Sequence, residues 1–324
     1  MTTPIRRAAH RHRPLVHFSV AMALVAAVAL VGVFVDSRVL AGAPIWLKPF
    51  KFAVSLSVYG LTLAWMLSLL PRRSRAAERA ATVIVAMSAV EMVVIVGQVV
   101  RGRTSHFNAT TPLDNALWQA MGAAILTLWL AHLVIAVVLI RRPLIDRAAT
   151  YGVRLGLGIA WLGMLAAVPM VLPGAAPDTP GITGAHSVGV ADCNRGTPVT
   201  GWNLDGGDLR IGHFVGLHGL QALPLLALGL SLLAGRSPRA RARLDERTRV
   251  RLLVVSAGAY AVLTAMLTWQ ALRGQPLLRP DAVTLGAFAA LAVATVTATV
   301  AVLRAGVPAD QAAATDRPPA TVLR

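Results

Sequence analysis

Charged residues are scarce in this chain. Only 14% of its 324 residues are Asp, Glu, Lys or Arg, whereas 56% are hydrophobic and the mean hydropathy is +0.65. A water-soluble chain usually carries about a quarter charged residues. The shortage excludes an ordinary globular enzyme, a disordered tail and a nucleic-acid-binding arm. It predicts an all-α polytopic membrane helix bundle whose main partner is the lipid bilayer.

Cysteine is nearly absent, and acidic residues are few. Cys193 is the single cysteine, which excludes an intrachain disulfide and every multi-cysteine pattern for metal binding or haem attachment. The chain has 14 acidic and 31 basic residues, a formal net charge of +17. Because the basic residues fall in short runs between apolar stretches, we interpret the excess as a topology signal and expect no nucleic-acid partner.

Long apolar stretches are abundant, and a helix needs roughly 20 apolar residues to cross a bilayer. Eight stretches qualify: 15–35, 52–70, 80–100, 116–140, 153–172, 211–234, 250–271 and 282–303. The predicted domain organisation is a basic cytoplasmic N-terminus (1–14), an eight-helix transmembrane domain (15–303) and a disordered cytoplasmic tail (304–324).

The distribution of Lys and Arg predicts the orientation. Alternate connections, such as 72–79 and 236–251, hold most of the basic residues, and cytoplasmic loops carry that excess. Both termini are therefore predicted to be cytoplasmic, in a plasma (inner) membrane. Segments 105–108 and 173–210 then lie outside the cell.

The segment 173–210 is the longest connection and is rich in glycine and proline. It shows neither a helical nor a strand period. A loop of this length is either disordered or functional. We expect a cap over the sixth span, which would bring His186 and Asp208 near the membrane.

Several polar side chains lie inside the predicted spans, where ionisable groups are functional candidates. Glu91 is the acid nearest to a midplane, in the third span, and Gln98 is seven residues further on. His218 and Gln221 in the sixth span reach a similar depth, with His132 in the fourth span as an alternative neighbour. These five residues form a predicted polar layer. Glu91 should be neutral or paired there, with His218 or Gln221 as its expected neighbour and His132 as the alternative.

A second set of polar residues is expected at the exterior mouth above this layer. Its members are Lys48, Lys51, Arg101, His106, Asp208, Arg210 and His213. The lysines lie among aromatic residues, which suits either an interfacial anchor or recognition of an anion. In the sixth span, Gly212 and Gly216 form a small-xxx-small pair that would admit a neighbouring helix or a flat cofactor.

Three pieces of the sequence carry a resemblance to a known family. They are 46–52, 98–108 with its SHFN motif, and 207–224 with the pattern GDLR-HF-GLH-Q-LP. Over residues 45–230 the chain resembles a family of bacterial eight-span membrane proteins that has no assigned activity. The resemblance implies the fold and no cofactor or catalytic residue.

Three functions stay open at this point. The first is transport of a small solute, coupled to protons through Glu91. The second is an oxidoreductase-like metal- or haem-binding protein. Its exterior ligands would come from His106, His186, Asp208, His213 and His218, holding haem or a transition metal. The third is a structural or assembly role. Enzymatic activity and oligomeric state are left open.

Overall fold

The computed structural model describes residues 12–142, 144, 146–172, 180–192 and 195–305. It confirms the all-α bundle, because eight of its helices are long and apolar enough to cross a membrane. These helices are α2 (Arg13–Val35), α3 (Leu47–Ser68), α4 (Arg75–Val100), α5 (Pro112–Arg141), α6 (Arg147–Leu165), α7 (Leu209–Ala234), α9 (Glu246–Leu272) and α10 (Ala282–Ala305). The short elements are β1 (Val39–Leu40), β2 (Ala43–Pro44), η1 (Val168–Val171), β3 (Ser187–Val188), β4 (Gly207–Asp208) and α8 (Pro238–Arg243).

Most helices begin several residues before the predicted apolar stretch. Ser74, Thr111, Asp146 and Asp245 each accept a hydrogen bond from the backbone N–H three residues later, at the start of α4, α5, α6 and α9. Such side chains satisfy amide groups that the first turn leaves free. Hydropathy misses these turns because capping and charged residues are polar.

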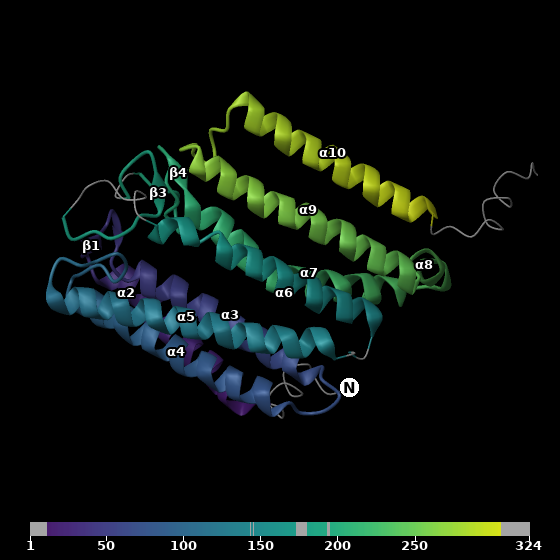
Figure 1. The fold of residues 1–324 in the computed structure, drawn as a ribbon, viewed down its shortest axis with the longest axis horizontal. Helices are drawn as coiled ribbons and strands as arrows, with labels where there is room; N and C mark the ends of the chain where they lie inside the picture. Colours follow the sequence, from purple (N-terminus) through teal and green to yellow (C-terminus); the bar gives the residue numbers. More distant parts are fainter. Residues whose placement is uncertain (1–11, 143, 145, 173–179, 193–194, 306–324) are drawn as a thin grey trace, which may run out of the picture.

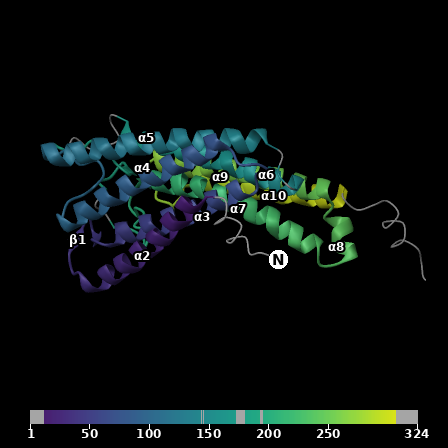
Figure 2. The ribbon, with the colours of Figure 1, turned by 90° about the horizontal axis from the view of Figure 1, so that it is seen from below.

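The long helices pack as two groups (Figure 1). In the first group α2 packs on α3 and α4 on α5, and Figure 2 shows α2 and α5 on opposite sides of it. In the second group α6, α7 and α9 pack on one another, and α10 contacts α9 at the edge. A shared core joins the groups: it includes Leu63 of α3, Leu139 of α5, Leu157 of α6 and Leu220 of α7.

The described chain begins and ends at one end of the bundle (Figure 1). We call this the opposite end; it holds the connections 69–74, 142–146 and 235–245. The other end, the capped end, holds 36–46, 101–111, 273–281 and the described residues of 166–208. The predicted N-terminus and tail lie mostly outside the described residues, as do Cys193 and residues 173–179.

Glycines bring α7 into backbone contact with two neighbours. A Cβ on Gly163 of α6 would lie 2.7 Å from Cα of Gly216, and a Cβ on Gly212 would lie 3.0 Å from the backbone nitrogen of Thr268 in α9. Neither distance leaves room for a methyl group. The predicted small-residue pair therefore serves helix packing, and helices occupy the place suggested for a flat cofactor.

The described part of 173–210, which we call the cap, packs over the start of α7. Within it β3 pairs antiparallel with β4. The amide of Leu209 donates to the carbonyl of His186 at 2.9 Å, and the amide of Thr183 donates to the carbonyl of Phe107 at 3.0 Å. The cap is thus held to α7 and to the connection between α4 and α5.

Candidate functional site

Lys48 and Lys51 lie in the first turns of α3, inside the helix rather than ahead of it. The predicted second span began at residue 52, whereas α3 begins at Leu47. Both lysine side chains are half-buried. Placing them on a helix fixes their direction, because residues three apart share a face. Their charges consequently lie at the capped end beside the cap.

Arg210 and Asp208 form a buried ion pair at the start of α7. The Arg210 Nε donates to Asp208 Oδ1 at 2.9 Å, and the Asp208 side chain is fully buried. Oδ2 of Asp208 also accepts from the amide of Asn203 at 2.8 Å. Both carboxylate oxygens are therefore engaged by the protein itself, which leaves Asp208 poorly placed to bind a metal.

Cations from the two helix groups meet on one turn of the cap. Lys51 of α3 donates to the carbonyl of Thr200 at 2.9 Å, and Arg210 of α7 donates to the carbonyl of Gly201 at 2.6 Å. Gly201 has φ +66°, a left-handed conformation that favours glycine. This turn ties α3 to α7 across the capped end.

Lys48 lies at the centre of the charged groups here. Its ammonium is within electrostatic reach of Arg210, Lys51, Glu91 and Asp192. It is 6.0 Å from the ring centre of Phe52. Among the described residues it has neither a hydrogen-bond partner nor a salt bridge. Its charge is surrounded by other charges and is bound by none of them.

An aromatic wall borders Lys48. The ring of His106 lies 5.6 Å from that of Phe52 and 5.7 Å from that of Trp118, and Phe107 lies 4.8 Å from His186. Burial, with the charges of Lys48 and of a protonated His186, holds the pKa of His106 well below its usual value. His106 is therefore neutral at neutral pH.

His186 is oriented by a carboxylate. Its Nδ1 lies 3.0 Å from Oδ2 of Asp192. Oδ1 of the same carboxylate accepts hydrogen bonds from the amides of His186 and Ser187. Burial lowers the pKa of His186 although the hydrogen bond to Asp192 opposes it. Burial alone would raise the pKa of Asp192, but the hydrogen bond and charge of His186 bring that pKa below its ordinary value. Asp192 is therefore ionised at neutral pH and is hydrogen-bonded to His186.

Gln98 and Arg101 converge on a residue that the sequence analysis missed. Gln98 and Arg101 donate to Oδ1 of Asp114 at 2.9 and 2.8 Å, and the Asp114 side chain is fully buried. Arg101 also donates to Gln98 Oε1 at 2.6 Å. Gln98, expected in the intramembrane layer, belongs to this capped-end network. The spacing of Thr111 and Asp114 could have indicated a helix start.

Glu91 stands apart from this network. It lies within α4, is 2% exposed, and neither carboxylate oxygen has a hydrogen-bond partner among the described residues. Lys48 is the charged group that acts on it. Ser88, one turn further into the helix, is also buried, and its hydroxyl has no hydrogen-bond partner within the described part of the chain.

The expected partners of Glu91 form their contacts elsewhere. His132 Nδ1 lies 2.8 Å from the Tyr59 hydroxyl, and Gln221 donates to Thr62 at 3.3 Å. His218 is exposed, with no hydrogen bond among the described residues. The prediction that one of these three pairs with Glu91 is wrong. Equal depth does not place side chains on facing sides of their helices.

The histidines do not assemble into a metal centre within the described part of the chain. His213 Nδ1 lies 2.8 Å from the carbonyl of Gly163, a helix-to-helix contact. No group of three or more His, Cys, Asp or Glu is arranged there to hold a metal ion. The metal hypothesis stays a prediction without geometric support from these residues.

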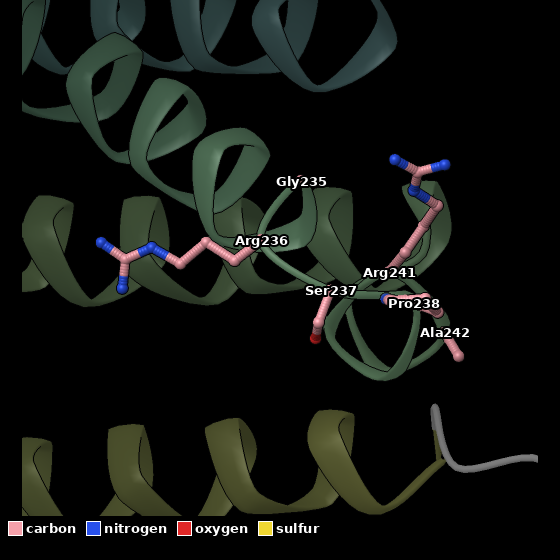
Figure 3. Close-up of a pocket in the computed structure, with 6 residues that line it drawn as sticks. All are labelled: Gly235, Arg236, Ser237, Pro238, Arg241 and Ala242. Atoms are coloured by element: carbon pink, nitrogen blue, oxygen red, sulfur yellow. The ribbon is translucent and has the colours of Figure 1, made fainter.

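A hollow at the opposite end offers no comparable convergence. It is lined by Gly235, Arg236, Ser237, Pro238, Arg241 and Ala242, around the turn into α8 (Figure 3). The side chains of Arg236 and Arg241 extend in different directions there. This basic turn holds no cluster of functional groups.

The cap supplies residues that no sequence signal identified. Asp192, Asn203 and the turn at Thr200 and Gly201 all lie in a stretch without period, so neither pattern nor spacing marked them. Asn203 is 3% exposed, and its amide donates to Ser187 Oγ at 3.0 Å. Their positions depend on how the cap folds over α7.

No protein-family model, curated protein or solved structure matches the chain. What its residues define is a multi-pass membrane helix bundle with a charged cluster under a folded cap.

Proposed function

We propose that this protein carries a small solute across the membrane and that Glu91 carries a proton coupled to that movement. The observation that supports this most is the unpartnered, 2% exposed carboxyl group in the interior of a membrane-length helix. By helix rise Glu91 lies about 14 Å from the capped end of α4. Intramembrane carboxyl groups at such depth serve proton relays and ion pathways.

A purely structural role suits Glu91 poorly. Side chains that lock helices have partners, since a buried polar group without one costs free energy. Gln98, on the same helix, has such partners: its amide nitrogen donates hydrogen bonds to Asp114 and to the carbonyl of Thr104. The carboxyl oxygens of Glu91 have no such donors in the described residues, which leaves them free to exchange a proton.

Lys48 supplies the link between proton and solute. A charged carboxylate at this depth needs a counter-ion, and the nearby ammonium provides one. Protonating Glu91 releases Lys48 from that role and changes the charge at the capped end. Gain of a proton at Glu91 therefore alters the site that a solute would first meet.

Further polar groups extend from Glu91 toward the opposite end. They are the buried hydroxyl of Ser88 on α4 and the hydrogen-bonded pair of Tyr59 and His132 on α3 and α5. Nε2 of His132 is buried and unpartnered among the described residues. Such groups can accept and pass protons, whereas an apolar interior cannot.

The test uses purified protein in proteoliposomes that enclose a pH-sensitive dye. Solutes of different charge are added singly, and solute-driven proton movement is recorded for the wild type, Glu91→Gln and Glu78→Gln. Glu78 is a matched control, because it lies on the same helix near the opposite end and pairs with Arg73 at 3.3 Å. We expect Glu91→Gln to abolish the movement and Glu78→Gln to preserve it.

Thermal unfolding of the same samples separates function from folding. Gln keeps the shape and hydrogen-bonding capacity of Glu, so the Glu91→Gln protein should unfold near the wild-type temperature. Undiminished proton movement in a folded Glu91→Gln protein would contradict the proposal. So would a wild type in which none of the solutes moves protons, which would favour the structural role.

A further inference from the structure

The charged groups around Lys48 balance when Lys48 is protonated and Glu91 is ionised. We call them the cap cluster: the cations Lys48, Lys51 and Arg210 and the acids Glu91, Asp192 and Asp208. Two of the acids already have partners: Asp208 pairs with Arg210, and Asp192 pairs with His186. The neighbouring His106 and His186 add no charge at neutral pH, because burial lowers both pKa values.

A proton on Glu91 leaves one positive charge in surplus. That surplus falls on Lys48, since Lys51 is bound by the Thr200 carbonyl and Arg210 by Asp208 and Gly201. The Lys48 ammonium has no hydrogen-bond or salt-bridge partner among the described residues, and its printed contact is with the Phe52 ring. A half-buried charge of this kind attracts an anion more strongly than one exposed to water.

The aromatic wall adds a requirement for an apolar body. The Phe52 ring centre lies 6.0 Å from the Lys48 ammonium, and the neutral ring of His106 lies 5.6 Å from Phe52 and 5.7 Å from Trp118. Lys48 and His106 are both half-buried, so some of their surface is accessible. A small carboxylate with an apolar portion satisfies the ammonium and the rings together, whereas a fully hydrated inorganic ion satisfies only the ammonium.

We propose that the cap cluster binds a small monovalent organic carboxylate on Lys48, against Phe52 and His106, together with one proton on Glu91. The inference rests on the proposed transport function and names its substrate class. Binding of both partners leaves the net charge of the cluster unchanged. A dicarboxylate or sulfate would leave one negative charge in excess and is disfavoured.

Lys48 is the titratable neighbour whose charge acts on Glu91, so the pH dependence of binding in the wild type belongs to this pair, and Glu91→Gln separates the two groups. The helices packed against α4 are α2, α3 and α5. Besides Lys48, their charged or titratable side chains are Arg13, His17, Lys51, Tyr59, Asp114, His132 and Arg141. Of these helices' groups, Lys48 alone has a charge that acts on Glu91.

The first experiment measures binding of radiolabelled benzoate to the purified full-length protein in detergent, between pH 5.5 and 8.5. A pH indicator in weakly buffered solution counts protons taken up. If one proton accompanies each benzoate, affinity should fall about tenfold per pH unit once Glu91 is ionised. We expect nitrate and sulfate to bind at least about tenfold more weakly than benzoate. Neither anion can make the ring contacts, and sulfate also leaves the charges unbalanced.

Three variants assign the roles. Lys48→Met should weaken benzoate binding at least about tenfold, since it removes the charge-assisted contact. At pH 5.5 Glu91→Gln should bind benzoate with no proton uptake. Arg103→Met is the matched control, because Arg103 is an exposed cation at the same end and should leave binding unchanged.

The outcomes separate this inference from the proposed function. Three results would each overturn the carboxylate site. They are benzoate binding that persists in a folded Lys48→Met protein, wild-type binding that does not depend on pH, and nitrate binding as tight as that of benzoate. If instead a cationic solute drives Glu91-dependent proton movement while benzoate fails to bind, the transport proposal stands and the carboxylate site falls. Benzoate bound with a proton but never moved across proteoliposomes overturns transport and supports the site.

Discussion

At the capped end the carboxylates of Asp114 and Asp208 are fully buried and each pairs with an arginine, whereas the described acids of the opposite end are exposed or only partly buried. Glu246 lies 3.9 Å from Arg147, with side chains 50% and 60% exposed. Buried pairs are strongly destabilised when one partner is lost, and exposed pairs contribute little. The same residue types thus build a site at one end and a solvated surface at the other.

The largest effect should come from breaking the Asp208–Arg210 pair. Asp208→Asn removes the charge opposite a guanidinium that is 20% exposed, and it weakens the hydrogen bonds that join cap and α7. We expect a loss of about 3 kcal/mol in the free energy of unfolding, measured by denaturation in mixed micelles. Glu246→Gln, the control at the opposite end, should cost less than about 1 kcal/mol. Equal losses of unfolding free energy in the two variants would contradict the proposed difference between the two ends.

A smaller effect is expected from the close helix contact near the cap. Gly216→Ala would force a methyl group against the backbone of Gly163, whereas Gly229, nearer the opposite end, has open space around its Cβ position. Overpacking of this kind costs about 1–3 kcal/mol. Gly229→Ala should be neutral or slightly stabilising, since alanine favours helix. Thermal unfolding of both variants checks the difference, and similar melting temperatures would contradict it.

The smallest effect concerns pH. The pKa of His106 is lowered in the folded protein from an ordinary value of 6.5, so below pH 6.5 the unfolded chain binds more protons and stability falls with falling pH. This contribution amounts to about 1.4 kcal/mol per pH unit. His106→Gln should therefore lose less stability than the wild type between pH 6 and 5. Parallel stability profiles would show that His106 is not held neutral by burial.

Element positions could be predicted well, and the assembly of the site only in part. Eight spans followed from apolar length, a local property, and the glycines of α7 were recognised as a packing feature. Lys48, Lys51, His106 and Arg210 were expected at one mouth, and Lys51, His106 and Arg210 do lie within electrostatic reach of Lys48. Their hydrogen-bond partners were not predictable, because the cap that supplies Thr200, Gly201 and Asp192 has no period.

The sequence by itself determined the number of spans, the depth of Glu91 within its helix and the gathering of cations at helix ends, because helix rise converts residue number into distance. Only the tertiary structure decided which groups meet. Depth leaves the rotation of each helix about its axis open, and close packing, such as Gly163 against Gly216, sets that rotation. It turned His132 to Tyr59 and Gln221 to Thr62, and it left Glu91 within electrostatic reach of Lys48.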